Sequence, residues 1–197
     1  MKISCMAQRR GAASLLCVLA AALVAGCAAV PGTGGGASSG AAATGVGHGW
    51  SKRMEDRRVA MERGTRGSNV EITRTSDNQL KLVVPSDIAF DPNGYALKPG
   101  LRSMLDRFAG LLAGDRTVQL TVVGHTDTSG GDAVNNPLSL DRAQSVRDYL
   151  VGRGVSATQI RTVGRGAREP IADNASEAGR ARNRRVEMFL AEAGSAG

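Results

Sequence analysis

The stretch from Ala28 to Gly49 consists almost entirely of Gly, Ala, Ser and Thr, and it separates the first residues from the part of the chain that can fold. Such a segment cannot bury enough apolar surface to offset the entropy lost on ordering. We therefore expect a flexible linker with a mean span of roughly 25 Å. Five of the six aromatic residues lie beyond residue 89. Residues 67–191 are predicted to form one domain of modest size, followed by a tail over 192–197.

The first 26 residues have the layout of a secretory signal peptide. Lys2, Arg9 and Arg10 provide a positive start, and an uncharged apolar run follows and ends at Gly26. The run is too short for a membrane span of about 20 residues. Its end, Leu23-Val24-Ala25-Gly26-Cys27, resembles the bacterial lipobox, in which cleavage precedes the cysteine and its sulfur is lipidated. The alternative is an ordinary signal peptide in which Cys27 is incidental.

Lipidation of Cys27 would anchor the chain stably. Each methylene buried in the membrane contributes roughly 0.8 kcal/mol to binding, so two or more acyl chains anchor a protein stably, whereas one gives only reversible attachment. Ala28 follows the cysteine, and by resemblance to enteric lipoproteins this favours the outer membrane. Cys5 and Cys17 lie in the signal peptide, so Cys27 is the one thiol expected in the mature chain. A single thiol excludes a disulfide within that chain.

The charge balance is basic without identifying a partner. The formal net charge is +7, and removal of the three basic residues of the signal peptide leaves about +4. The arginines are dispersed without interleaved aromatic residues, which argues against a nucleic-acid partner. A basic surface beside an anionic polymer or a membrane fits the composition better.

Apolar periodicity predicts two elements before the main helices. Residues 50–63 have helical spacing, with Trp50, Met54 and Met61 on one side. We expect a solvated helix there, with a spacer helix and a partner-binding helix as alternatives. Residues 70–72 and 80–84 alternate between apolar and polar on either side of a turn, which predicts a β-hairpin.

The remaining pattern alternates between helix and strand. Residues 97–112 have helical spacing, with Pro99 suited to the first position and Gly114 to the end. A strand over 117–123 follows, then a second helix capped by Ser139. A short strand over 160–163, a helical turn over 177–182 and a last strand over 185–190 complete the chain. The order β-α-β-α-β-β predicts an α/β (α+β) two-layer sandwich, with helices packed on one face of a mixed β-sheet.

Asp127 and Arg142 are the most informative charged pair. Asp127 follows the 117–123 strand in a Gly-rich turn, and Arg142 is expected in the first turn of the helix that Ser139 caps. A helix start favours a carboxylate, and Arg can bind one bidentately. With the polar side chains of Thr126, Asn135 and Asn136 nearby, the pair suits a ligand that carries both an ammonium and a carboxylate. The alternative is that Asp127 and Arg142 pair with each other and only fix the loop.

Several short motifs occur together between residues 84 and 190. They are Phe90-Asp91, Gly124-His125-Thr126-Asp127, Asn135 with Leu138-Ser139 and Arg142-Ala143, Gly164-Arg165-Gly166, and Asn183-Arg184-Arg185-Val186-Glu187. In combination they resemble the peptidoglycan-binding domain shared by outer-membrane protein A, the peptidoglycan-associated lipoprotein and the flagellar motor stator protein.

The resemblance implies a ligand and a set of contacts. Asp127 and Arg142 would grip the diaminopimelate residue of the peptidoglycan stem peptide, whose side chain ends in a zwitterion. Asn135 would assist, and the loop with Asp91 and Asn93 would line the pocket. Thr126, beside Asp127, completes the predicted site.

Two features depart from the pattern of this family, and a third is interpreted as structural. Gly130-Gly131-Asp132 adds a flexible acidic turn, and Pro137 stands directly before Leu138; either could alter how the loop closes on the ligand. Asn183-Arg184-Arg185 precedes a predicted edge strand, and we interpret it as structural, with a direct ligand contact as the alternative.

The sequence offers little material for catalysis. A metal site needs three or four clustered ligands, and the mature chain has one Cys with His48 and His125 far apart. We expect no enzyme, no cofactor and no metal; His125 is expected to order the strand end. The predicted function is an outer-membrane lipoprotein, anchored through Cys27, that binds peptidoglycan non-covalently. The alternative is an envelope assembly lipoprotein that acts through protein partners without binding the wall.

Overall fold

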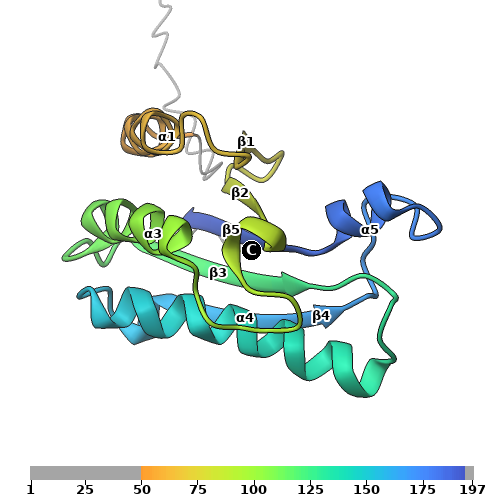
Figure 1. Ribbon diagram of the computed structural model, residues 1–197. Helices are drawn as coiled ribbons and strands as arrows, with labels where there is room; N and C mark the ends of the chain where they lie inside the picture. Colours follow the sequence, from red (N-terminus) through yellow and green to blue (C-terminus); the bar gives the residue numbers. More distant parts are fainter. Residues whose placement is uncertain (1–49, 194–197) are drawn as a thin grey trace, which may run out of the picture. The chain divides into compact units, whose positions relative to one another are not determined.

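The computed structural model describes residues 50–193 (Figure 1). The helices are α1 (Lys52–Gly64), α2 (Ser86–Ala89), α3 (Pro99–Leu112), α4 (Asp132–Gly152), the 3₁₀ turn η1 (Ala157–Gln159) and α5 (Glu177–Asn183). The strands are β1 (Glu71–Arg74), β2 (Leu80–Pro85), β3 (Val118–His125), β4 (Ile160–Gly166) and β5 (Arg185–Glu192). The predicted signal peptide, Cys27 and the linker over 28–49 lie outside the described residues. Within residues 50–193, no helix is long and apolar enough to cross a membrane.

The strands form one mixed sheet in the order β1-β2-β5-β3-β4. β3 and β4 are parallel, as expected for strands joined by the α4 crossover, and the other neighbouring pairs are antiparallel. The predicted hairpin is β1 and β2, and the predicted alternation of helix and strand follows it. The expected α/β fold with a mixed sheet and packed helices is therefore confirmed.

The last strand, β5, lies at the centre of the sheet and not at its edge. It pairs with β2 on one side and β3 on the other. Val186 and Met188 are buried toward the core, while Arg185 and Glu187 are buried on the opposite face. The predicted edge position is wrong, because the strand inserts between two earlier ones.

The core lies between the sheet and the helices. Leu82, Met188 and Val122 are aligned across β2, β5 and β3, and all three are fully buried. Leu105 of α3 and Val146 of α4 belong to the same buried cluster. Fully burying one such side chain contributes about 1.5–3 kcal/mol. Figure 1 shows α4 running along β3 and β4, the strands that carry the site described below.

The first described helix, α1, is part of this core. Its start is capped by Ser51, whose Oγ accepts a hydrogen bond from the Met54 N–H at 3.1 Å. Met54 and Met61 are 1% and 4% exposed and belong to the main cluster. Arg57 forms an ion pair with Asp115. The helix was expected, but its interpretation as a solvated helix is wrong, because its apolar side packs on the domain.

Candidate functional site

α4 lies in direct backbone contact with the sheet because glycines leave room for it. A Cβ added at Gly124 would lie 1.9 Å from the Ser139 carbonyl oxygen, and one at Gly164 would lie 2.8 Å from the Leu140 nitrogen. The Gly166 N–H donates to Ser139 Oγ at 2.9 Å. This close approach fixes the middle of α4 against the ends of β3 and β4.

The start of α4 differs from the prediction. The helix begins at Asp132, with Gly131 as its N-cap and no capping side chain. Ser139 is therefore inside the helix, where it bonds β4 and not the helix start. Arg142 is also in the helix interior, so the expected help from free N–H groups at a helix start does not apply to it. Pro137 is accommodated within the helix.

The six predicted site residues line one polar cavity of about 480 Å³. Thr126 and Asp127 directly follow β3, and Asn135 and Arg142 come from α4. Asp91 and Asn93 belong to the loop between α2 and α3. The cavity lies in the size range of small-molecule sites. The structure thus brings together residues that lie as far apart in sequence as Asp91 and Arg142.

Asp127 is buried and held in its ionised form. Its Oδ2 accepts a hydrogen bond from Arg184 Nη1 at 2.8 Å, and its Oδ1 accepts one from the Ser129 N–H at 2.8 Å. Burial alone would raise the pKa of Asp127, but the hydrogen bonds from Arg184 and Ser129 outweigh it and hold that pKa below its usual range. A carboxylate has about four acceptor positions, so Asp127 can accept further bonds from a ligand.

Arg142 is held in place without an ion pair. Its Nε donates to the Gly94 carbonyl at 2.9 Å, and its guanidinium lies 5.2 Å from the Phe90 ring centroid. Burial lowers the pKa of Arg142, although an arginine stays protonated in proteins. No carboxylate of residues 50–193 comes within 4.0 Å of its guanidinium nitrogens. Asp127 and Arg142 therefore do not form an ion pair with each other, which excludes the alternative that such a pair only fixes the loop.

Asn135 and Thr126 both line the cavity but differ in their hydrogen bonds. The Asn135 amide donates to the Asp127 carbonyl at 3.0 Å and to the Gly130 carbonyl, so it closes the loop between β3 and α4. Thr126 Oγ1 is buried and has no hydrogen-bond partner in the described part of the chain. A buried hydroxyl without a partner is costly. Thr126 is thus a candidate for a direct ligand contact, whereas Asn135 orders the loop.

The loop between α2 and α3 forms the rim of the cavity. Asp91 is exposed, and its carboxylate lies 3.7 Å from Lys98 Nζ. Asn93 is also exposed, and its φ of 55° places it in the left-handed region that Asn tolerates. The Gly94 carbonyl in this loop receives the hydrogen bond from Arg142. Arg142 therefore ties the rim to α4.

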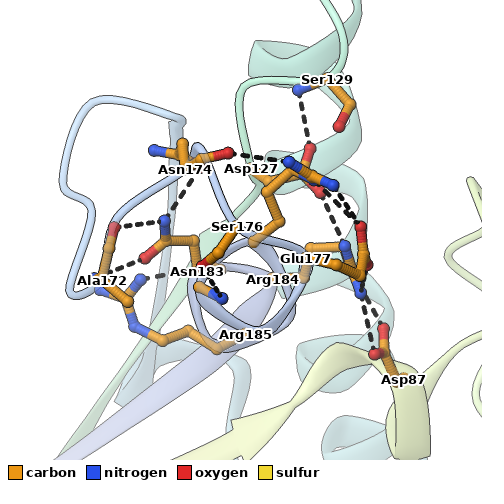
Figure 2. A network of polar contacts seen from close by, with 12 residues as sticks. Asp87, Asp127, Ser129, Ala172, Asn174, Ser176, Glu177, Asn183, Arg184 and Arg185 are labelled. Carbon is orange, nitrogen blue, oxygen red and sulfur yellow. Dashed lines mark hydrogen bonds and ion pairs between the residues drawn. The ribbon is translucent and has the colours of Figure 1, made fainter.

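Arg184 is a site residue that the sequence analysis missed, as are Asp87 and Glu177. It lines the cavity and contacts three carboxylates at once, as Figure 2 shows: Asp87 at 3.1 Å, Asp127 at 2.8 Å and Glu177 at 3.1 Å. The hydrogen bonds with Asp87 and Asp127 raise the pKa of Arg184. The motif Asn183-Arg184-Arg185, which precedes a strand expected at an edge, was interpreted as structural in preference to a direct ligand contact.

The residues on either side of Arg184 do have structural roles. Asn183 is fully buried, and its Oδ1 accepts the N–H groups of Ile171 and Ala172 at 2.8 and 3.0 Å (Figure 2). Arg185 Nε donates to Glu187 Oε1 at 2.7 Å on the face of the sheet away from the core. The predicted structural reading holds for these two residues.

His125 ends β3 behind the cavity and does not line it. It is 1% exposed, and its Nε2 lies 3.9 Å from Glu187 Oε2. Burial, with the nearby charge of Arg185, lowers the pKa of His125 to about 4, so the side chain is neutral near pH 7. Among residues 50–193, no three His, Cys, Asp or Glu side chains cluster in a way that could hold a metal ion.

The cavity lining carries charges of both signs. The acidic cluster of Asp87, Asp127 and Glu177 surrounds the single guanidinium of Arg184, which leaves an excess of two negative charges. Arg142 lines the same cavity and is a cation without an ion-paired carboxylate among the described residues. Such a cavity can bind a cation and an anion of the same ligand.

Comparisons with known proteins show which domain the chain resembles. Residues 89–184 match the model of the OmpA family. Over 125 residues the chain is 41% identical to the probable lipoprotein YiaD of Escherichia coli, covering 64% of this chain and 57% of YiaD. Over 111 residues it is 44% identical to the peptidoglycan-binding protein ArfA of Mycobacterium tuberculosis, covering 56% of this chain and 34% of ArfA. The matches thus span about half of one relative and a third of the other.

A solved structure has the same fold. The cell wall anchor of the T6SS from Pseudomonas aeruginosa aligns with a TM-score of 0.59 and 29% identity, covering 69% of this chain and 95% of that one. The expectation that the chain is not an enzyme is confirmed, since the matched family consists of non-enzymatic domains. Residues 89–184 of this chain therefore form an OmpA-like domain.

Proposed function

We propose that this protein binds peptidoglycan non-covalently through the zwitterionic end of diaminopimelate. The observation that carries the proposal is that one cavity holds both an acidic cluster, with Asp127 in it, and Arg142, which forms no ion pair within residues 50–193. The ligand ammonium would share Asp127 with Arg184, and the ligand carboxylate would bind Arg142, bidentately where the geometry allows. The name of ArfA, a peptidoglycan-binding protein, supports this assignment.

The wider role we propose is a tether between the outer membrane and the wall. Lipid on Cys27 would hold one end, the Gly-rich linker would supply reach, and the domain would bind the wall. Because the anchor confines the domain close to its ligand, a weak single-site affinity can still give persistent attachment. The relatives YiaD, a probable lipoprotein, and outer membrane protein A of Bordetella avium support this localisation.

Co-sedimentation with purified sacculi tests the site. The mature chain, residues 27–197 with Cys27→Ser, should sediment with sacculi, and free meso-diaminopimelate should compete. Asp127→Ala and Arg142→Ala should each lose binding at least tenfold, since each removes a charge-assisted bond to the ligand. Asp77→Ala and Arg116→Ala are matched controls, because both side chains are exposed and outside the cavity. Equal binding by all four variants would refute the site.

Two further outcomes address the rest of the proposal. If the unaltered chain itself fails to sediment, the alternative of an assembly lipoprotein that acts through protein partners gains support. The anchor is tested separately by mass spectrometry of the mature N-terminus. An unmodified Cys27, or membrane attachment that survives Cys27→Ser, would contradict the lipid anchor.

A further inference from the structure

A second depression, here called the apolar groove, lies on the other side of α2 from the polar cavity. It has a volume of about 520 Å³ and is bounded by the segment 64–70 after α1, by β2 and by the first turns of α3. Ser86 and Asp87 of α2 line the polar cavity, whereas Ile88 lines the groove. The two sites are therefore neighbours that do not share a lining residue.

The floor of the groove is apolar. Val70, Val84, Ile88, Leu101 and Met104 line it. Ile88 is 40% exposed, and Met104 and Val70 are half-buried at the edge of the core. Methionine adapts its shape readily, which suits a surface that receives a flexible apolar group. Apolar side chains grouped in a depression of this size indicate a binding surface better than scattered ones do.

The charged residues of the groove are all basic. Arg66 and Arg107 line it, and no Asp or Glu is among the described residues that do so. Arg107 Nη1 donates to the Gly64 carbonyl, which fixes this guanidinium at the groove wall. Arg66 makes no ion pair within residues 50–193. The groove thus differs from the polar cavity, where four carboxylates are present.

We propose that the apolar groove binds a free fatty acid, with the acyl chain on the apolar floor and the carboxylate at Arg66 and Arg107. The charge complementarity favours an anion, because two arginines face no competing carboxylate. The five apolar side chains favour an acyl chain, because burying it against them removes apolar surface from water. Thr65, Ser68, Asn69 and Ser103 supply the uncharged polar part of the lining. The proposal does not depend on peptidoglycan binding, because it uses different residues.

The groove can be blocked without disturbing the fold. A Cβ added at Gly100, which lines the groove, meets no atom within 4 Å. Gly100→Phe should therefore fill the groove and weaken dodecanoate binding at least tenfold, measured by isothermal titration on residues 27–197 with Cys27→Ser. Gly110→Phe is the matched control, because Gly110 lies on the same helix, meets no atom within 4 Å and is outside the groove. Equal dodecanoate affinity of the two variants would overturn the proposal.

The charge requirement is tested in the same way. Arg66→Ala should weaken dodecanoate binding about tenfold, and Arg102→Ala, an exposed arginine of α3 outside the groove, should not. A neutral dodecyl glycoside, used below its micellar concentration, should bind at least tenfold more weakly than dodecanoate. Binding of phosphatidylglycerol vesicles without binding of dodecanoate would overturn the proposal in favour of membrane docking. Gly100→Phe should leave sedimentation with sacculi unchanged, and its loss there would also overturn the assignment.

Discussion

Gly124→Ala would test whether close contact between β3 and α4 builds the site. The added Cβ would lie 1.9 Å from the Ser139 carbonyl oxygen and 2.8 Å from its carbonyl carbon. A carbon and an oxygen in close contact are normally about 3.3 Å apart. The helix backbone must therefore move by more than about 1 Å, because no flexible side chain can give way in its place.

The free-energy cost of this movement is the sum of two contributions. Overpacking a tight contact costs about 1–3 kcal/mol. A shift of α4 also breaks the hydrogen bond from the Gly166 N–H to Ser139 Oγ, which contributes about 1 kcal/mol. We expect Gly124→Ala to lower the free energy of unfolding by about 3 kcal/mol, a large part of the 5–15 kcal/mol typical of a domain.

Urea denaturation of the mature chain gives the measurement. Gly110→Ala is the control, because a Cβ there meets no atom within 4 Å and Ala favours a helix interior over Gly by about 0.5–1 kcal/mol. The control should be neutral or more stable. At low temperature, where Gly124→Ala remains folded, its binding to sacculi should also fall, because Arg142 moves with α4. A loss of stability below about 1 kcal/mol would refute the reasoning.

Three further predictions follow from individual side chains. His125 has its pKa lowered to about 4 by burial, so as the pH falls from about 6.5 the unfolded chain takes up a proton first, and up to about 3 kcal/mol of stability is lost by pH 4. In His125→Gln the free energy of unfolding, measured by urea titration at each pH, should lack this part of its decline. Equal dependence of that free energy on pH in the two proteins would contradict the prediction. Arg184→Lys keeps the charge but loses the planar fork that joins three carboxylates, so affinity for sacculi should fall about tenfold, while an unchanged affinity would argue against its role. Met54→Ala should cost about 2–4 kcal/mol in chemical denaturation, against under about 0.5 kcal/mol for the exposed Lys52→Ala, and similar values for both would mean that α1 is not part of the core.

The elements with strong local patterns were predictable from the sequence. Apolar alternation located β2 and β3, and Pro99 with Gly114 marked the limits of α3, where Gly114 adopts a φ of 83°. The start of α4 was not predictable in the same way, because its N-cap is Gly131 and contributes no side-chain signal. Ser139 has the residue type of a cap, but its hydroxyl bonds a distant strand.

The residues that form the site were predictable, but the contacts between them were less so. The six expected residues share one cavity, but the partner of Asp127 is Arg184, which is distant in sequence. That contact depends on β5 entering the centre of the sheet, and no local pattern encodes a strand's position among its neighbours. Long-range pairing of this kind also explains why the structural role of α1 was missed, since Met54 and Met61 have their packing partners much later in the chain.

The docking of α1 has a mechanical consequence for the proposed tether. Ser51, at its start, donates to Glu192 at the far end of β5 at 2.8 Å, while Arg184 and the polar cavity lie at the near end of the same strand. The eight residues of β5 span about 26 Å, so anchor and ligand would pull from opposite ends of the domain. Such a force would enter the domain through the covalent chain at the start of α1, so the packing of Met54 and Met61 and the hydrogen bond from Ser51 to Glu192 would bear it before the strands of the sheet do.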